Sequence, residues 1–356
     1  MTGPAIRDNN FDLLRLLFAG AVFLWHVAVL TKAPALQAFG LVFSAEIGVK
    51  GFFVISGYLV MMSYENSSSL RDYAGKRARR IYPAYAAVVI ACAGGGMVLS
   101  ALPAAEYLSA GLARYLAANL AFLNFLAPTL PGVFDAQPYA EVNGALWTLK
   151  IEVMYYAFVP VLAWLAALLG RWRVLAVLYV LAAAWFIVLG ELHARSGAAL
   201  WLQLQRQLPG QLGYFLAGAG LYFLRGRLDG KWLALVAAAA ATYGVVTMIG
   251  NPLLSILLEP LALGILVVWA AVGLPCFGNF SRYGDFSYGV YIVHFPVIQA
   301  LLALGVFAIG PWAGFWTAAA LVALLSLASW HLVEKPFLAR RSHYRGAAAL
   351  SRAKET

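Results

Sequence analysis

Charged residues are scarce in this chain: they make up 11% of its 356 residues, whereas a soluble domain has about 25%. This scarcity argues against a soluble globular domain, and the 63% hydrophobic content predicts an all-α polytopic membrane protein. Cysteine is also rare. Cys92 and Cys276 lie in or beside apolar segments, and neither their number nor their spacing suggests a disulfide framework or a metal site.

Ten segments are long and apolar enough to cross a bilayer. Their predicted bounds are 11–31, 44–63, 82–102, 145–169, 172–190, 208–224, 232–250, 253–273, 287–309 and 312–333. A shorter apolar stretch at 112–126 has the length of a re-entrant or interfacial piece. No repeat of fixed period is visible, and no polar segment has the length of a soluble domain.

The basic residues are distributed unequally about these spans. Most of the 25 lysines and arginines fall on the side of the N-terminus, and the opposite loops hold Lys32, Arg114, Arg195 and Arg206. The positive-inside rule then predicts that both termini are cytoplasmic. The net charge of +10 therefore reflects topology, and it does not predict a nucleic-acid partner. We predict a membrane domain over 1–337 and a short basic cytoplasmic tail over 338–356, which is either disordered or lies against anionic lipid.

The first predicted span contains two ionisable residues, Arg15 and His26. Eleven residues of α-helix turn through about 1100° and rise about 16 Å, so the two side chains share one face half a bilayer apart. Ionisable residues at membrane depth are costly and usually mark a functional site. Arg15 could instead pair with Asp12 one turn earlier, and His26 could bond a neighbouring carbonyl. The shared face favours a site.

Two further spans carry ionisable residues. In the span at 145–169, Glu152 lies about two turns from the outer end, at the expected level of His26. Lys150 is a poor partner for Glu152, because residues two apart on a helix do not face each other. A carboxylate beside a histidine could orient the ring for general-base catalysis. In the span at 287–309, Tyr291 and His294 are three apart and could form a polar stripe, although His294 could equally be a hydrogen-bonded structural residue.

Three other patterns have a possible functional interpretation, and two of them also have a plain one. Ser56 and Gly57, in an aromatic-rich span, allow a close approach by a ligand or by another helix. The basic loop that contains Arg77 and Arg80 could bind an anion or could simply set the topology. The outer connection 103–144 carries polar and aromatic residues that could hold a hydroxylated acceptor; they are Asp135, Tyr139, Glu141 and Asn143. His331 and Glu334 are interpreted mainly as part of a helix end.

Six motifs in order along the chain resemble those of the acyltransferase-3 family of integral membrane acyltransferases, and the resemblance covers nearly the whole chain. The matches are Arg15-x10-His26; Phe52-Phe53-x-x-Ser56-Gly57; Arg77-x-x-Arg80 before Tyr82-Pro83; Leu146-Trp147-Thr148-Leu149-x-x-Glu152; Ser287-Tyr288-x-x-Tyr291-x-x-His294; and Val333-Glu334-Lys335-Pro336-Phe337.

The resemblance implies a membrane enzyme that moves an acyl group, expected to be acetyl from acetyl-CoA, to a hydroxyl of an envelope or exported sugar. It implies a bacterial inner membrane location, membrane lipids around the protein, a carbohydrate or lipid-linked sugar as acceptor, acetyl-CoA as co-substrate, and no bound cofactor or metal. We expect the catalytic residues to be His26, Glu152 and Arg15, the donor-binding residues to be Arg77, Arg80, Ser56 and Gly57, and further polar site residues to be Tyr288, Tyr291 and His294. Arginines suit CoA phosphates because a guanidinium forms bidentate, charge-assisted bonds.

Two lysines depart from the family pattern: Lys50 beside the Phe-Phe element and Lys150 beside Glu152. The resemblance does not explain them. The alternative function is a secondary transporter, which intramembrane charges and glycine-rich helices would also suit. Transporters often show matching halves and broken helices, and the two halves of this sequence show no such symmetry.

Overall fold

The structure is a computed structural model that describes residues 9–228, 230–278 and 284–338. Over these residues every regular element is a helix. Each of the ten predicted spans overlaps one of them. These helices are α1 (Phe11–Thr31), α3 (Ala45–Glu65), α4 (Leu70–Leu99), α7 (Trp147–Leu169), α8 (Arg171–Ser196), α10 (Leu208–Leu224), α11 (Trp232–Ile249), α12 (Pro252–Val272), α13 (Ser287–Ala303) and α15 (Pro311–Ala328). The largest difference is at α4, which begins at Leu70 and not near 82. Arg77 and Arg80, predicted in a loop, therefore lie in a helix, so that prediction is wrong.

Eight spans within the described residues meet the length and hydropathy expected for crossing a membrane. The other two helices of the ten, α10 and α13, have 17 residues each, which is the lower end of the spanning range. The stretch predicted as too short to span, 112–126, overlaps α6 (Ala110–Leu120), a helix of 11 residues. The chain is therefore an all-α polytopic membrane protein. The predicted tail lies almost entirely outside the described residues.

Short helices connect the spans. They are η1 (Pro34–Leu36), α2 (Gln37–Val42), α5 (Ala104–Tyr107), α6, η2 (Asn124–Leu126), η3 (Gly144–Leu146), α9 (Ala199–Gln205), α14 (Val306–Ile309), the π-helix η5 (Ser329–Glu334) and α16 (Lys335–Phe337). The chain divides into two compact units. The first unit comprises Met1–Leu14, Val49–Ala74 and Ile151–Asn279, and the second comprises Arg15–Gly48, Gly75–Lys150 and Phe280–Thr356.

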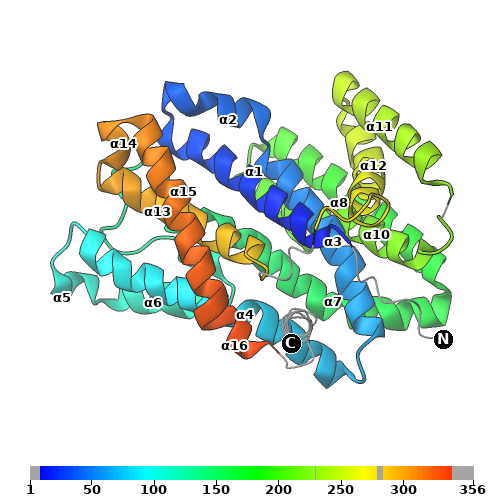
Figure 1. Cartoon of the computed structure of the whole chain (residues 1–356), viewed down its shortest axis with the longest axis horizontal. Helices are drawn as coiled ribbons and strands as arrows, with labels where there is room; N and C mark the ends of the chain where they lie inside the picture. Colours follow the sequence, from blue (N-terminus) through cyan, green and yellow to red (C-terminus); the bar gives the residue numbers. More distant parts are fainter. Residues whose placement is uncertain (1–8, 229, 279–283, 339–356) are drawn as a thin grey trace, which may run out of the picture. The chain divides into compact units, whose positions relative to one another are not determined.

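In the first unit, α10 packs against α8 and α12, and α11 pairs with α12 (Figure 1). Helix α3 crosses α10 at two glycines, one on each helix, and each glycine contacts the backbone of the other helix. A Cβ atom on Gly57 would overlap the carbonyl oxygen of Phe215, and a Cβ atom on Gly218 would overlap that of Val54. Small residues let membrane helices approach to backbone contact, so this crossing explains the glycine after Ser56 by packing.

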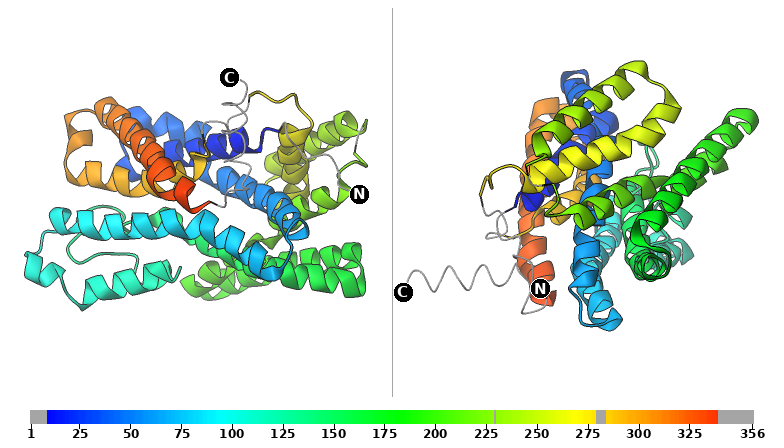
Figure 2. Two further views of the ribbon diagram at one scale, coloured as in Figure 1. Left: turned by 60° about the horizontal axis from the view of Figure 1, so that its bottom comes forward. Right: turned by 90° about the vertical axis from the view of Figure 1, so that its right-hand side faces the viewer.

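In the second unit, α13 and α15 lie side by side, and the small helix α14 links them (Figure 1). The segment of α5 and α6, cyan to teal in Figure 2, runs along α4. Two tyrosines fasten it: the Tyr107 hydroxyl donates to the Ala93 carbonyl at 2.5 Å, and the Tyr85 hydroxyl donates to the Asn119 carbonyl at 2.7 Å.

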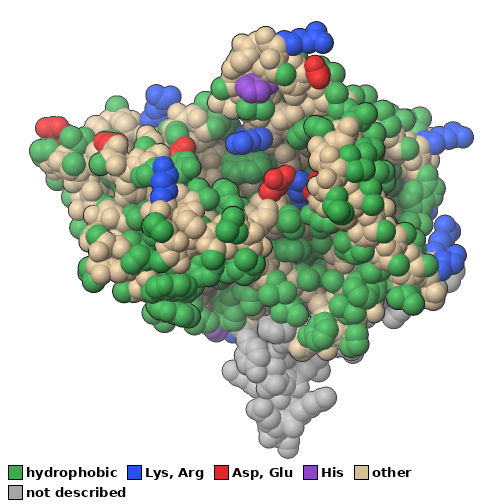
Figure 3. Space-filling view, turned by 90° about the horizontal axis from the view of Figure 1, so that it is seen from above, with side chains coloured by type: hydrophobic (Ala, Val, Ile, Leu, Met, Phe, Trp, Pro, Cys, Tyr) green, Lys and Arg blue, Asp and Glu red, His purple; other side chains and the backbone are tan. Residues whose placement is uncertain are grey.

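The surface is rich in apolar side chains. On the face in Figure 3, hydrophobic groups are spread over much of the area and charged groups are few. Leu41, Met248 and Ile309 are each more than four-fifths exposed. Many large apolar side chains are exposed in this way, as a lipid-facing surface requires.

Candidate active site

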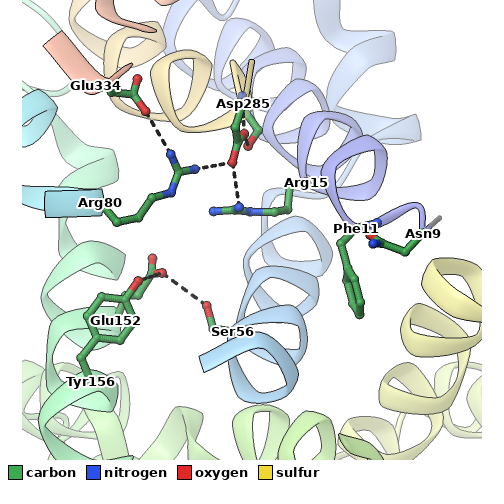
Figure 4. Close-up of polar contacts among 10 residues, drawn as sticks. Asn9, Phe11, Arg15, Ser56, Arg80, Glu152, Tyr156, Asp285 and Glu334 are labelled. Atoms are coloured by element: carbon green, nitrogen blue, oxygen red, sulfur yellow. Dashed lines mark hydrogen bonds and ion pairs between the residues drawn. The ribbon is translucent and has the colours of Figure 1, made fainter. Parts of the chain in front are cut away.

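The second unit contains a buried cluster of two arginines and two carboxylates. Arg15 Nη1 lies 2.8 Å from Asp285 Oδ2, Arg80 Nη2 contacts the same carboxylate oxygen, and Arg80 Nη1 lies 3.3 Å from Glu334 Oε2 (Figure 4). The side chains of Asp285 and Glu334 are 1% and 2% exposed. The two positive and two negative charges of these four side chains balance, which is how buried charges are normally accommodated.

Four separate segments supply the cluster. Arg15 comes from α1, Arg80 from α4, Glu334 from the π-helix η5, and Asp285 from the connection before α13. Asp285 also accepts hydrogen bonds from the backbone N–H and the hydroxyl of Ser287 at the start of α13. The helix dipole stabilises a negative charge at this end of the helix. The Tyr288 ring lies 5.8 Å from Arg80 Cζ, and its hydroxyl donates to the Ile81 carbonyl at 2.9 Å.

The turn that presents Asp285 depends on the residue before it. Gly284 has a φ of +122°, a conformation that side chains rarely adopt, and a Cβ atom there would overlap the Trp330 indole. The indole itself is buried, with 2% exposure. Gly284 therefore packs directly against the indole of η5 just before α13 begins.

The second unit also holds two histidines in direct contact. His26 Nδ1 of α1 lies 3.1 Å from His294 Nε2 of α13, and the ring centroids are 4.9 Å apart. His294 is fully buried, and His26 is half-buried. Nε2 of His26 has no hydrogen-bond partner among the residues that the structure describes. A base or nucleophile needs such an available nitrogen.

Tyr291 and Thr148 form a second buried polar pair beside His294. Their hydroxyl oxygens are 2.6 Å apart, and the Tyr291 and His294 rings meet edge to face with centroids 5.9 Å apart. Asn143 also contacts α13: its side-chain amide donates a hydrogen bond to the Ile292 carbonyl at 2.8 Å. Asn143 is buried and is engaged with the protein backbone, and its role in acceptor binding stays a prediction. Tyr139, in the same connection, is 40% exposed.

Glu152 belongs to the first unit, where it accepts two hydrogen bonds on one oxygen. Tyr156 Oη lies 2.5 Å from Oε1, and Ser56 Oγ lies 3.4 Å from it (Figure 4). Among the described residues, the hydrogen bonds of this carboxylate thus come from a tyrosine and a serine. Because Glu152 and His26 belong to different units, their pairing stays a prediction. In the second unit, Nδ1 of His26 faces His294 and the Val22 carbonyl, so a carboxylate that contacts the ring must meet Nε2.

The two lysines that depart from the family pattern have defined neighbours. Lys50 Nζ lies 2.8 Å from Glu259 Oε1 and 5.3 Å from the centroid of the Tyr214 ring, all in the first unit. Lys150 Nζ lies 4.4 Å from the centroid of the Phe125 ring in the second unit. Lys50 is thus half of a largely buried ion pair that joins α3 to α12.

The predicted donor residues separate into different surroundings. Arg80 is buried in the charged cluster, and Arg77, one turn earlier on α4, is half-buried. Ser56 contacts Glu152, and Gly57 contacts the backbone of α10. Their role in donor binding stays a prediction.

Sequence reasoning missed Asp285 and Glu259 and treated Glu334 mainly as a helix end. Glu259 carried a usable signal, because it is an ionisable residue inside an apolar span. Asp285 lies in a connection, where an acidic residue is ordinary, and no periodic pattern marks it. Glu334 is buried in a π-helix, a feature frequent at functional sites that sequence periodicity does not reveal.

Comparison with known proteins decides the family. The family described as "Acyltransferase domain" matches residues 8–332. The chain belongs to the acyltransferase-3 family. This acyltransferase-3 protein is 30% identical to "Nodulation protein 10" of Rhizobium leguminosarum bv. viciae, over 94% of each chain. It is also 30% identical to "O-acetyl transferase" of Shigella phage Sf6, over 94% of this chain and 98% of the phage protein. No solved structure matches it.

Family membership confirms the resemblance seen in the sequence motifs. The acyltransferase-3 protein is a multi-pass membrane acyltransferase, and it acts with an acyl donor and an acceptor.

Proposed function

We propose that this protein is a membrane O-acetyltransferase, which moves an acetyl group from cytoplasmic acetyl-CoA to a hydroxyl of a cell-envelope or exported polysaccharide or glycolipid. The name of the phage relative supports acetyl as the group and oxygen as its destination. The orientation predicted from the basic residues supports a cytoplasmic donor, an outer acceptor and a bacterial inner membrane location.

The observation that carries the proposal is the half-buried His26 imidazole in α1, whose Nε2 is without a hydrogen-bond partner among the described residues. In the proposed step, the acceptor hydroxyl gives its proton to this nitrogen while its oxygen attacks the thioester carbonyl. The carbon–sulfur bond breaks, and CoA leaves as a thiolate that takes up a proton. An alternative course has Nε2 attack the thioester first and carry the acetyl group to the acceptor.

The arginines have a proposed role at the donor end. A guanidinium has five N–H donors, so Arg15 and Arg80 can bind phosphate oxygens while they keep their carboxylate partners. Asp285 and Glu334 then serve to hold the guanidiniums in place and to balance their charge when no donor is bound. Arg77 lies one turn from Arg80 on α4, so it could contribute a further guanidinium to donor binding.

Transfer of label from acetyl-CoA tests the proposal directly. Bacterial membranes that contain the protein are incubated with acetyl-CoA radiolabelled in the acetyl group, and alkali-labile label in the glycan fraction is measured. We expect label in membranes with the wild-type protein and background label with His26→Ala. A secondary transporter would move solute across sealed vesicles without covalent labelling, so solute uptake together with unlabelled glycan would overturn the proposal.

A further inference from the structure

The contacts of His294 and His26 define where each ring carries its proton. His294 Nδ1 lies 3.2 Å from the Val290 carbonyl oxygen, and His26 Nδ1 lies 2.9 Å from the Val22 carbonyl oxygen. The remaining nitrogen of His294, Nε2, lies 3.1 Å from His26 Nδ1. A carbonyl oxygen only accepts hydrogen bonds, so each Nδ1 that faces one is assigned as the N–H donor.

Only one arrangement of protons in two neutral rings satisfies all three contacts. With its proton on Nδ1, His294 donates to Val290 and has a lone pair on Nε2. That lone pair accepts the Nδ1 proton of His26, which also points toward the Val22 carbonyl. In the reverse arrangement His294 donates from Nε2, and two unprotonated nitrogens then face carbonyl oxygens at 2.9 Å and 3.2 Å. Facing lone pairs repel, so the reverse arrangement is unfavourable.

We propose that His294 is a positioning residue for His26: it accepts the Nδ1 proton of His26 and so holds the ring in the tautomer that presents the Nε2 lone pair. The Val22 carbonyl belongs to the same helix as His26, whereas His294 reaches the ring from α13 and fixes it from a second direction. The importance of this tautomer for catalysis rests on the proposed function. It applies to both courses of that reaction, because base and nucleophile are the same nitrogen.

The surroundings of His294 explain why a histidine fills this position. Its ring is fully buried, with the rings of Phe23, Phe295 and Tyr291 as neighbours. A carboxylate could accept the same proton, but an ion at this depth is costly. A neutral imidazole supplies the acceptor without a buried charge. When His26 takes a proton on Nε2, its Nδ1–H stays bonded to His294, and the positive charge is supported from that side.

Two substitutions separate hydrogen bonding from packing. His294→Phe keeps an aromatic ring in an aromatic site and removes the acceptor. His294→Gln can place an amide oxygen near the former Nε2. Outer partners that orient a catalytic or metal-binding histidine typically contribute about 10–100-fold, so we expect kcat of His294→Phe to fall by that factor with little change in KM for acetyl-CoA. We expect His294→Gln to recover most of kcat. A kcat near wild type for the phenylalanine variant, or no recovery with glutamine, would overturn the inference.

Nitrogen NMR tests the tautomers in the wild-type protein without any need for activity. The wild-type protein is labelled with ¹⁵N-histidine, held in detergent micelles at alkaline pH, and both histidines are assigned from His26→Gln and His294→Gln spectra. We expect protonated Nδ1 and unprotonated Nε2 in both rings. A proton on Nε2 of His294 would refute the inference. If instead the tautomers are as expected and His26→Ala still transfers acetyl groups, the catalytic role in the proposed function is the part that fails.

Discussion

Replacement of Asp285 by asparagine should destabilise the second unit strongly, because this carboxylate contacts both Arg15 and Arg80. The four side chains of the cluster carry balanced charges, and Asp285→Asn leaves one net positive charge in a buried position. Removing one partner of a buried ion pair typically costs about 3–5 kcal/mol. By the scaling for domains of comparable size, this corresponds to a fall of roughly 6–20 °C in the unfolding midpoint.

A second substitution makes the charge argument specific. Arg15→Met removes a positive charge and keeps an unbranched side chain of similar length. The double variant Asp285→Asn/Arg15→Met is again balanced, with Arg80 still paired to Glu334. Replacement of a whole buried pair by apolar groups is often close to neutral, so the double variant should be more stable than Asp285→Asn alone.

Thermal unfolding in detergent micelles measures both effects through a cysteine. Cys92 of α4 is half-buried and Cys276 is exposed, so a thiol-reactive fluorophore reports unfolding at Cys92 in a Cys276→Ser background. Asp135→Asn, at an exposed position of the outer connection, is the control. The reasoning is refuted if Asp285→Asn lowers the midpoint no more than the control does. It is also refuted if the double variant shows the sum of the two single losses.

Three further predictions concern the donor, the helix crossing and the carboxylate. Arg80→Lys should raise KM for acetyl-CoA more than KM for the acceptor, because a point charge cannot replace a bidentate guanidinium. A KM for acetyl-CoA equal to that of the wild-type protein would exclude phosphate binding by Arg80. Gly57→Ala should lower the free energy of unfolding by about 1–3 kcal/mol, because the added methyl group meets the backbone of α10. Gly244→Ala is the control in the same unfolding assay and should have little effect, because a Cβ atom at Gly244 meets no other atom. Glu152→Gln should lower kcat strongly, and kcat of the double variant Glu152→Gln/His26→Ala should be hardly lower than that of His26→Ala. If the double variant instead loses kcat by the product of the two single factors, the two residues act independently.

The helices could be predicted from the sequence because hydropathy over about 20 residues reflects the thickness of the bilayer. The shared face of Arg15 and His26 followed from helix geometry alone. Their partners did not, because Asp285 and His294 are about 270 positions away in the sequence and meet α1 through tertiary packing. The stripe of Tyr291 and His294 was predicted correctly as a shared face, but its contact with His26 requires the packing of α13 on α1.

Other site features depend on details that residue patterns do not encode. Ser56 was predicted beside the donor, and the structure gives it a hydrogen bond to Glu152 from another helix. The Gly57 crossing was one of two stated possibilities, and only the position of the α10 backbone shows that a helix occupies that space. Glu334 was assigned mainly to a helix end because its π-helical turn is set by tertiary contacts.

The central claim is that His26 in α1 performs the proton or acyl transfer of an acetyl-CoA-dependent O-acetyltransferase. The most direct measurement compares purified wild-type protein and His26→Ala in proteoliposomes, with labelled acetyl-CoA and a membrane glycan fraction as acceptor. General acid–base catalysis typically contributes about 10²–10⁴-fold, so the account predicts that the variant inserts and folds normally but loses transfer by at least that factor. Transfer within a few-fold of wild type by a correctly folded His26→Ala protein would contradict it.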